Sequence, residues 1–226
     1  MVVPLRKDWP HLTIIALMLM GSLIVWPFAP QRVPIHWDIS GRPDEYASKL
    51  PGLFLLPAVA LGIYLLMVLL PNIDPGRANY RQFTTPYYII RLVILLMMGV
   101  VHAIVLLWAL GLEVNMVRVL AIALGLAMAL LGNLMGKIRP NWFVGVRTPW
   151  TLASKRSWVR THRMAGLTMT PLGLLIALAG VIAPYGWLVL GAILLLVADV
   201  IWLTLYSYLV WRSDPERISS IHTTPE

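Results

Sequence analysis

The residues best suited to chemistry lie between positions 132 and 165, in a polar stretch flanked by two long apolar segments. This stretch carries seven of the eighteen Lys and Arg residues and has no Asp or Glu. Cationic side chains bind phosphate and carboxylate groups and are costly among lipid tails. Trp, Pro and Gly recur between the polar residues. We therefore expect a shaped polar structure at a membrane surface, where function is concentrated.

A second polar cluster contains His36, Asp38 and Asp44. One imidazole and two carboxylates could hold a divalent cation, although their spacing matches no tight metal motif. The other interpretations are a loop held by its own hydrogen bonds and ion pairs, and a surface that binds a partner. Pro34 favours extended chain around it, and residues 40–44 favour a turn.

Two ionisable residues, His102 and Asp199, fall inside long apolar segments. Such a residue within a membrane marks either a functional path or a hydrogen-bonded structural pair. We favour the structural role, with His102 or Asn133 as the partner of Asp199, and a proton or cation path is the alternative. Arg91 lies at the mouth of the segment that holds His102, where its long side chain can reach water.

The sequence argues against an enzyme. Residues 132–165 contain no carboxylate that could act as a base, and the chain has no phosphate-binding or dinucleotide-binding fingerprint. With no Cys, it has neither a thiol nucleophile nor a thiolate metal site. We expect no cofactor. We also expect no direct binding of nucleic acid, because basic residues in membrane proteins mostly set topology.

The elements that must position these residues are membrane-spanning helices. Of 226 residues, 59% are hydrophobic and 12% are charged, which is about half the charged fraction of soluble domains. A helix needs about 17–25 apolar residues to cross a bilayer. The composition therefore predicts an all-α membrane protein with six transmembrane helices. The six segments are 12–29, 53–70, 92–112, 117–136, 167–183 and 187–211.

Positive charges indicate the orientation and the domain organisation. With six spans, fourteen Lys and Arg residues share one side with both termini and four lie on the other side. Cytoplasmic loops carry the excess, so both termini and the basic loop are predicted to be cytoplasmic. Residues 1–88 then form an N-terminal module with two spans and an extracellular loop at 30–51. Residues 89–211 form a four-span region with a basic cytoplasmic loop at 132–165, and residues 212–226 form a polar tail.

The basic loop between the fourth and fifth spans has its own predicted structure. Two prolines with a glycine between them exclude a regular helix from residues 137–150. Thr148, followed by proline, fits the N-cap of an interfacial helix over residues 149–163. Trp158 would face the lipid boundary, and His162 would follow one turn later on the same face.

The fourth span has one face of small residues, which include Gly125, Ala129 and Gly132. A face without large side chains allows another helix to approach closely. We expect this face to serve packing within the chain rather than dimerisation.

Two motifs carry a resemblance to a known family. GNLMGKIRPNWFVGVRTPWTL followed by SWVRTHRMAG is similar to the signature of the SdpI family of bacterial membrane proteins, and VPIHWDISGRPDEYASK resembles the N-terminal module often joined to it. The resemblance covers residues 11–211 and implies six spans in a bacterial inner membrane. In the cytoplasmic motif it marks Asn133, Pro140, Asn141, Gly145, Arg147, Thr148, Pro149, Trp150, Thr151, Trp158, Thr161 and His162. In the outward module it marks Pro34, His36, Gly41, Pro43, Asp44 and Lys49. Most of these, together with Asp38, are candidate ligand-binding or partner-binding residues, and none is assigned a catalytic role.

The resemblance implies protection against a membrane-active toxin, because some members are immunity proteins that also act as receptors and hold a cytoplasmic repressor at the membrane. Our first hypothesis is therefore a receptor or immunity protein, with the lipid bilayer around it, a peptide toxin outside and a repressor inside. The second is a small proton-coupled or ion-coupled transporter or channel that uses His102 and Asp199. The third is a metal-assisted membrane enzyme at His36, Asp38 and Asp44.

Overall fold

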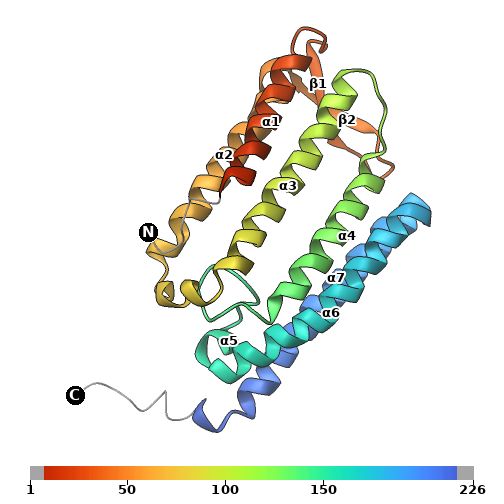
Figure 1. Ribbon diagram of the computed structural model, residues 1–226. Coiled ribbons are helices and arrows are strands. Elements are labelled where there is room, and N and C mark those ends of the chain that lie inside the picture. The colour runs from red at the N-terminus through yellow and green to blue at the C-terminus, as the bar shows by residue number, and fades with distance from the viewer. Residues whose placement is uncertain (1–7, 218–226) are drawn as a thin grey trace.

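The computed structural model describes residues 8–217, and over this range the chain folds into six long helices (Figure 1). Five are long and apolar enough to span a membrane, and α1, with 17 residues, is at the short limit. The predicted all-α membrane protein of about six spans is confirmed. The predictions for residues 1–7 and 218–226, which include the end of the polar tail, lie outside the described residues. The six helices are α1 (Trp9–Val25), α2 (Lys49–Ile73), α3 (Thr84–Ala109), α4 (Met116–Met135), α6 (Lys155–Ile182) and α7 (Tyr185–Arg212).

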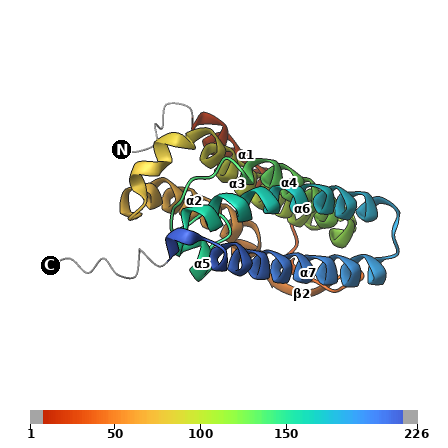
Figure 2. The same cartoon turned by 90° about the horizontal axis from the view of Figure 1, so that it is seen from below.

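The helices form two groups that lie side by side (Figures 1 and 2). Helices α1, α2 and α3 pack on one another, α6 packs against both α4 and α7, and α3 joins the groups through α4. The strands β1 (Arg32–Trp37) and β2 (Pro43–Ser48) lie at one end of the bundle. The short elements η2 (Arg77–Gln82), α5 (Pro149–Ala153) and η3 (Pro215–Arg217) lie at the other end. The boundary at residue 88 between an N-terminal module and a four-span region stays a prediction. Helix α3, which follows that boundary, contacts helices of both groups.

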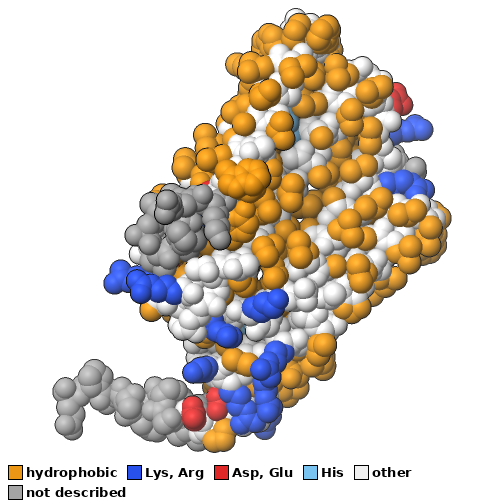
Figure 3. Space-filling view, viewed as in Figure 1, with side chains coloured by type: hydrophobic (Ala, Val, Ile, Leu, Met, Phe, Trp, Pro, Cys, Tyr) orange, Lys and Arg blue, Asp and Glu red, His pale blue; other side chains and the backbone are white. Residues whose placement is uncertain are grey.

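The surface of the bundle matches a membrane environment. Apolar side chains cover its sides, and Lys and Arg gather at the end that carries α5 (Figure 3). Large side chains such as Leu167 and Val200 are more than 60% exposed on helices that are among the candidate spans. Exposed apolar area of this extent is stable against lipid but not against water. The bilayer is therefore the main contact of this protein.

The small-residue face of α4 packs against α6 within the chain, as predicted. A Cβ atom added to Gly125 would lie 2.5 Å from the carbonyl oxygen of Gly173, and one added to Gly132 would lie 2.7 Å from Thr170 Oγ1. Helices approach this closely only where the crossing carries no side chain. The pair α4–α6 is therefore the tightest crossing that these glycines create.

The predicted helix over 149–163 is wrong in its extent, because the chain breaks at Ser154. Thr148 caps α5 through a reciprocal capping box with Thr151. Ser154 has extended backbone, and its hydroxyl oxygen accepts the N–H of Ser157 at 2.9 Å. A second N-cap starts a new helix, so Lys155 begins α6, which continues without interruption through the fifth span. The basic residues after Ser154 thus belong to the end of a spanning helix.

The segment between α1 and α2 forms an antiparallel hairpin, which confirms the predicted extended chain and turn. Strand β1 pairs with β2 from Arg32 opposite Ser48 to Trp37 opposite Pro43. The register is irregular around Ile35, which has no partner residue in β2. Val33 is fully buried against Gly52, where a Cβ atom would lie 2.8 Å from the valine side chain. The hairpin is therefore seated on the start of α2.

Candidate functional site

The hairpin carries the first group of predicted site residues. His36 Nδ1 and Asp44 Oδ1 lie 2.6 Å apart across the strands. Asp38 turns away from this pair, because its Oδ1 accepts the N–H and the hydroxyl of Ser40 and the N–H of Arg42. Its hydrogen bond with the Ser40 hydroxyl lowers the pKa of Asp38 below its ordinary value. The three proposed metal ligands are thus not assembled, and residues 8–217 hold no cluster of three or more His, Asp or Glu side chains suited to a metal.

Protonation of His36 should stabilise the hairpin. The hydrogen bond to Asp44 raises the pKa of His36 above 6.5, and both side chains are exposed. A raised folded-state pKa gives a contribution that is complete below the unfolded value and is lost as the pH rises through the folded value. We expect the His36 ring resonances in an NMR titration to change above pH 6.5. In Asp44→Asn they should return toward 6.5, and an unchanged midpoint would contradict the pairing.

The other hairpin residues hold its turn and its base. Gly41 has φ +82°, and a Cβ atom there would lie 2.7 Å from Asn115 Nδ2, which donates to the Ser40 carbonyl. This contact ties the turn to the start of α4. Lys49 Nζ lies 4.9 Å from the ring centre of Trp26, a cation–π geometry. The hairpin is therefore fixed to α2 and α4, and Lys49, the first residue of α2, joins α2 to the end of α1.

Asn141 organises the loop between α4 and α5. Its side chain is buried, and Nδ2 donates to the carbonyls of Arg139 and Val144. Its Oδ1 accepts the N–H groups of Phe143 and Val144. Four hydrogen bonds from one amide replace the backbone pairing that the two prolines prevent. Asn141 thus shapes the loop and has no free group left for a ligand.

Trp158 and His162 form the core beneath this loop. They stack with ring centres 4.1 Å apart, one turn apart on α6 as predicted. Trp158 is only 1% exposed and donates Nε1–H to the Ile138 carbonyl, so the predicted lipid-facing position is wrong. His162 Nε2 accepts the N–H of Val146, and Nδ1 donates to the Trp158 carbonyl. Both ring nitrogens are used, so His162 is a neutral structural group.

The segment between α2 and α3 packs against the loop between α4 and α5. Asp74, at the end of α2, is buried, and its carboxylate accepts the hydroxyl of Tyr80 at 2.8 Å and the N–H of Trp142 at 3.1 Å. Burial raises the pKa of Tyr80, so the phenol stays protonated and donates. Asn79 Nδ2 donates to the Pro140 carbonyl at 2.7 Å. These bonds join the two helix groups at the basic end of the bundle.

Gly145→Ala should destabilise this loop by about 2 kcal/mol or more. Gly145 has φ +108°, a conformation that L side chains rarely adopt, and a Cβ atom would lie 2.2 Å from His162 Nε2. Thermal unfolding in detergent measures the loss. Gly136→Ala, where a Cβ atom would meet only the side chain of Arg163 at 3.8 Å, should behave as the unaltered protein. Equal stability of both variants would contradict this account.

The remaining motif residues link the loop to α7 or lie on its surface. Thr148 Oγ1 lies 2.9 Å from Ser207 Oγ, and Trp150 meets the ring of Tyr208 edge to face. Thr151 and Thr161 are buried, and Pro149 is exposed. Asn133 is exposed near the end of α4 and lies outside the motif core. The motif therefore builds a fixed platform rather than an open pocket.

The platform presents cationic and aromatic side chains. Arg147 Nη1 donates to the Trp142 carbonyl at 2.8 Å, and the Trp142 side chain is 55% exposed. Arg77, Arg81 and Arg139 are also exposed on the two loops that form it. Asp74 is buried beneath these side chains, and its carboxylate accepts hydrogen bonds from Tyr80 and Trp142 rather than forming an ion pair with the arginines. We refer to Arg77, Arg81, Arg139, Trp142 and Arg147 as the basic platform.

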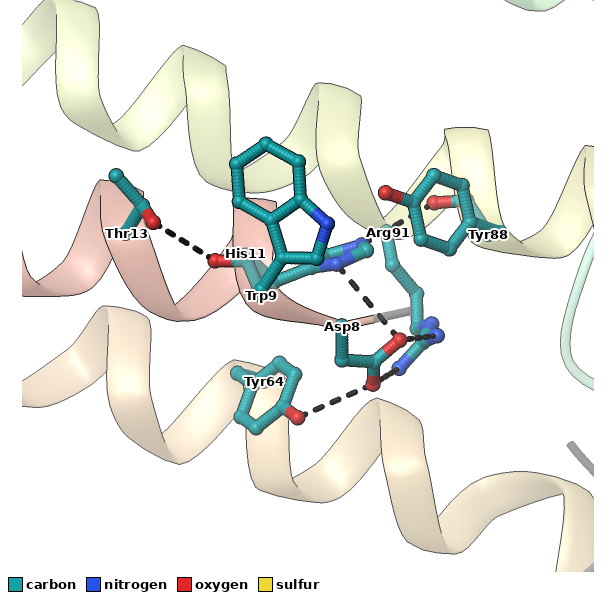
Figure 4. A network of polar contacts seen from close by, with 7 residues as sticks. All are labelled: Asp8, Trp9, His11, Thr13, Tyr64, Tyr88 and Arg91. Carbon is teal, nitrogen blue, oxygen red and sulfur yellow. Dashed lines mark hydrogen bonds and ion pairs between the residues drawn. The ribbon is translucent and has the colours of Figure 1, made fainter. Parts of the chain in front are cut away.

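The sequence did not predict the polar network at the start of α1, drawn in Figure 4. Arg91 is buried rather than extended to water, and its Nη1 and Nη2 each lie 2.8 Å from an oxygen of Asp8. Tyr64 donates its hydroxyl to Asp8 at 3.1 Å, and His11 Nε2 lies 3.3 Å from the Tyr88 carbonyl. Asp8 precedes a proline-containing helix start, the one local signal that could have singled it out.

The two intramembrane residues do not pair. His102 Nε2 lies 3.0 Å from both Ser22 Oγ and the Met18 carbonyl, so it bonds to α1. Asp199 is partly exposed on α7, in the other helix group. The predicted partnership of Asp199 with His102 is therefore wrong, because α1 supplies the acceptor that His102 needs. A path through both residues is not assembled.

Comparison with known proteins agrees with both motifs. Residues 137–207 match the SdpI/YfhL protein family, and residues 13–61 match a domain of unknown function, DUF1648. The chain is 28% identical over 204 residues to immunity protein SdpI of Bacillus subtilis (strain 168), an alignment that covers 90% of this chain and 95% of that protein. It is 40% identical over 38 residues to the uncharacterized membrane protein YbgB of the same strain, which covers 17% of this chain and 42% of YbgB. No solved structure matches significantly. Residues 137–207 therefore carry the region that defines the SdpI/YfhL family, and the similarity to immunity protein SdpI runs through nearly the whole of each chain.

Proposed function

We propose that this chain is an immunity and signal-receptor protein of the bacterial cytoplasmic membrane that protects against a membrane-active peptide toxin. The observation that carries the proposal is the alignment with immunity protein SdpI, which covers 95% of that protein. A match of this extent includes the hairpin, the basic platform and the helices between them. Both ends of the molecule are therefore part of the similarity.

In this proposal the termini and the basic platform are cytoplasmic, and the hairpin is extracellular. The excess of Lys and Arg at the platform end supports this orientation. The chain has no Cys, so single cysteines can be introduced cleanly. Impermeant maleimide added to intact cells should label Glu45→Cys and spare Lys155→Cys. Labelling of only the second variant would reverse the orientation.

The hairpin is proposed to meet the toxin, and the basic platform to hold a cytoplasmic repressor. The hairpin is tied to α2 through Val33 and Gly52 and to α4 through Gly41 and Asn115. Trp142 of the platform is tied to the end of α2 through Asp74. The loop that carries Trp142 is tied to α6 through the hydrogen bond from Trp158 to the Ile138 carbonyl. Because α2 enters both sets of contacts, we propose that α2 carries a change at the hairpin to the platform.

Deletion of the gene tests the protective role. Cells that lack it should be killed at a lower concentration of secreted membrane-active peptide than cells that carry it. The peptide source is culture supernatant from strains of the same species, and a plasmid copy of the gene should restore resistance. Unchanged sensitivity to every such supernatant would overturn the proposal.

A further inference from the structure

An apolar groove of about 450 Å³ lies beneath the hairpin. Its roof is the run Ile35, His36 and Trp37 of β1. Its walls come from α2 and α4, and its floor comes from Val101 and Val105 of α3. Apart from His36, its lining side chains are apolar or amphipathic. The volume of the groove falls within the range of ligand sites, which starts at about 300 Å³.

A hydrogen-bond donor without a partner belongs to the lining. Trp37 Nε1–H is buried and has no acceptor among the described residues, although the Trp37 ring lines the groove. A buried indole N–H normally finds a partner, and leaving one unpaired costs free energy. Because Nε1 is buried, the Trp37 ring must rotate before its N–H can donate to a ligand carbonyl in the groove.

The groove mouth is acidic. His36 lies at the mouth, Asp44 bonds to it at 2.6 Å, and Glu45 is its partner residue in β2. Both carboxylates are on the exposed strand β2 and act on His36, whereas the nearby Lys49 is turned onto Trp26 and the exposed Arg42 acts on Asp38 at the turn. This charge attracts a cationic peptide and repels the phosphate of a lipid headgroup.

The roof favours a peptide for a second reason. Ile35 has no partner residue in β2, and its neighbours His36 and Trp37 follow it along the groove. A strand edge over a groove can pair with the backbone of an extended peptide, which a lipid chain does not offer.

We propose that the groove under the hairpin binds an apolar segment of a cationic, membrane-active peptide, with Trp37 Nε1 donating to a backbone carbonyl and Glu45 attracting the positive charge. This inference rests on the proposed function and names the site at which that function begins. A peptide held there is kept beside α3 and α4 and does not assemble in the bilayer.

A second groove provides a matched control. It holds about 390 Å³ between α4, α6 and α7, and every side chain that lines it is apolar. Leu55 in the first groove is 61% exposed and Leu124 in the second is 53% exposed. Cysteine at either position can carry a fluorophore in a comparable setting.

The experiment uses the full chain in vesicles of phosphatidylethanolamine and phosphatidylglycerol. The probe is a synthetic Leu-rich peptide flanked by Lys that carries a fluorescence quencher. We expect saturable quenching of the label at Leu55→Cys and only weak, linear quenching at Leu124→Cys. Trp37→Phe should weaken binding about two- to tenfold, the range of one hydrogen bond. Glu45→Gln should weaken it about two- to fivefold, the range of one exposed charge pair.

Equal quenching at both positions, or no quenching at Leu55→Cys, would overturn the groove assignment. So would Trp37→Phe and Glu45→Gln proteins that bind as tightly as the unaltered chain. A quencher on a phospholipid chain serves as a third arm. Saturable, Trp37-dependent quenching by that lipid alone would make the groove a lipid site and would also overturn the proposal.

A test in cells separates this inference from the proposed function. Val59→Trp fills the first groove and Leu124→Trp fills the second. In a deletion strain that is sensitised, Leu124→Trp should restore resistance and Val59→Trp should not, at equal membrane levels. If Val59→Trp restores resistance fully, the groove assignment fails and the protective function stands. If deletion causes no sensitivity, the protective function fails on its own.

Discussion

Arg91→Met should lower the free energy of unfolding by about 3–5 kcal/mol, because it leaves the Asp8 carboxylate buried without its counter-ion. Both side chains are 2% exposed, and two hydrogen bonds of 2.8 Å join them in a bidentate pair. Tyr64 donates a third hydrogen bond to the same carboxylate, which does not replace the lost positive charge. Urea or thermal unfolding of the purified protein in detergent measures the change.

Two control variants make this prediction specific. Arg81→Gln removes an exposed cation of the same type and should change stability by less than about 0.5 kcal/mol. The double variant Asp8→Asn with Arg91→Met removes both charges and should be more stable than Arg91→Met alone. Strictly additive losses in the double variant would mean that the two residues do not act as a pair.

Gly125→Leu should cost about 3 kcal/mol or more, because the new side chain has no space at the α4–α6 crossing. Even the first carbon of that side chain would lie 2.5 Å from both the Gly173 oxygen and the Ala177 nitrogen. These are backbone atoms, so the helices must separate rather than rearrange a flexible side chain. The loss is measured by thermal unfolding in detergent.

Gly62→Leu is the matched control for this substitution. Gly62 lies on α2, another spanning helix, and a Cβ atom there would meet no atom within 4 Å. We expect normal stability for this variant and normal membrane levels in cells. If Gly62→Leu were as damaging as Gly125→Leu, the cause would be a general effect of leucine in a helix rather than the crossing.

Most of the fold could be predicted because hydropathy is a local property. A run of apolar residues near the bilayer thickness forms a spanning helix whatever lies beside it, so each of the six predicted segments falls on a long helix. The starts of α3 and α6 were missed, because these helices begin at Thr84 and Lys155, well before the predicted segments 92–112 and 167–183. The hairpin was also predicted in outline, since Pro34 and Gly41 restrict the backbone directly. The break at Ser154 was missed, because the serine can sit inside a helix or cap a new one.

The site was predicted in composition but not in role. The motif residues Asn141, Trp158 and His162 do come together, yet their polar groups are consumed by bonds inside the loop. A motif in the sequence identifies candidate residues, but the same polar side chain can bind either a ligand or a backbone group of the chain itself. Only the positions of Ile138 and Val146 show that here the partners are carbonyl and N–H groups of the chain itself.

The sequence by itself determined where the chain crosses the membrane and which of its ends is basic. The tertiary structure decided which polar groups meet. Asp8 and Arg91 are 83 residues apart, and His102 bonds to Ser22 across 80 residues. Burial requires that each such group has a partner, but it does not specify which one, since that depends on how separate helices pack. The groove beneath Trp37 is a product of the same packing, so no local pattern in the sequence could indicate it.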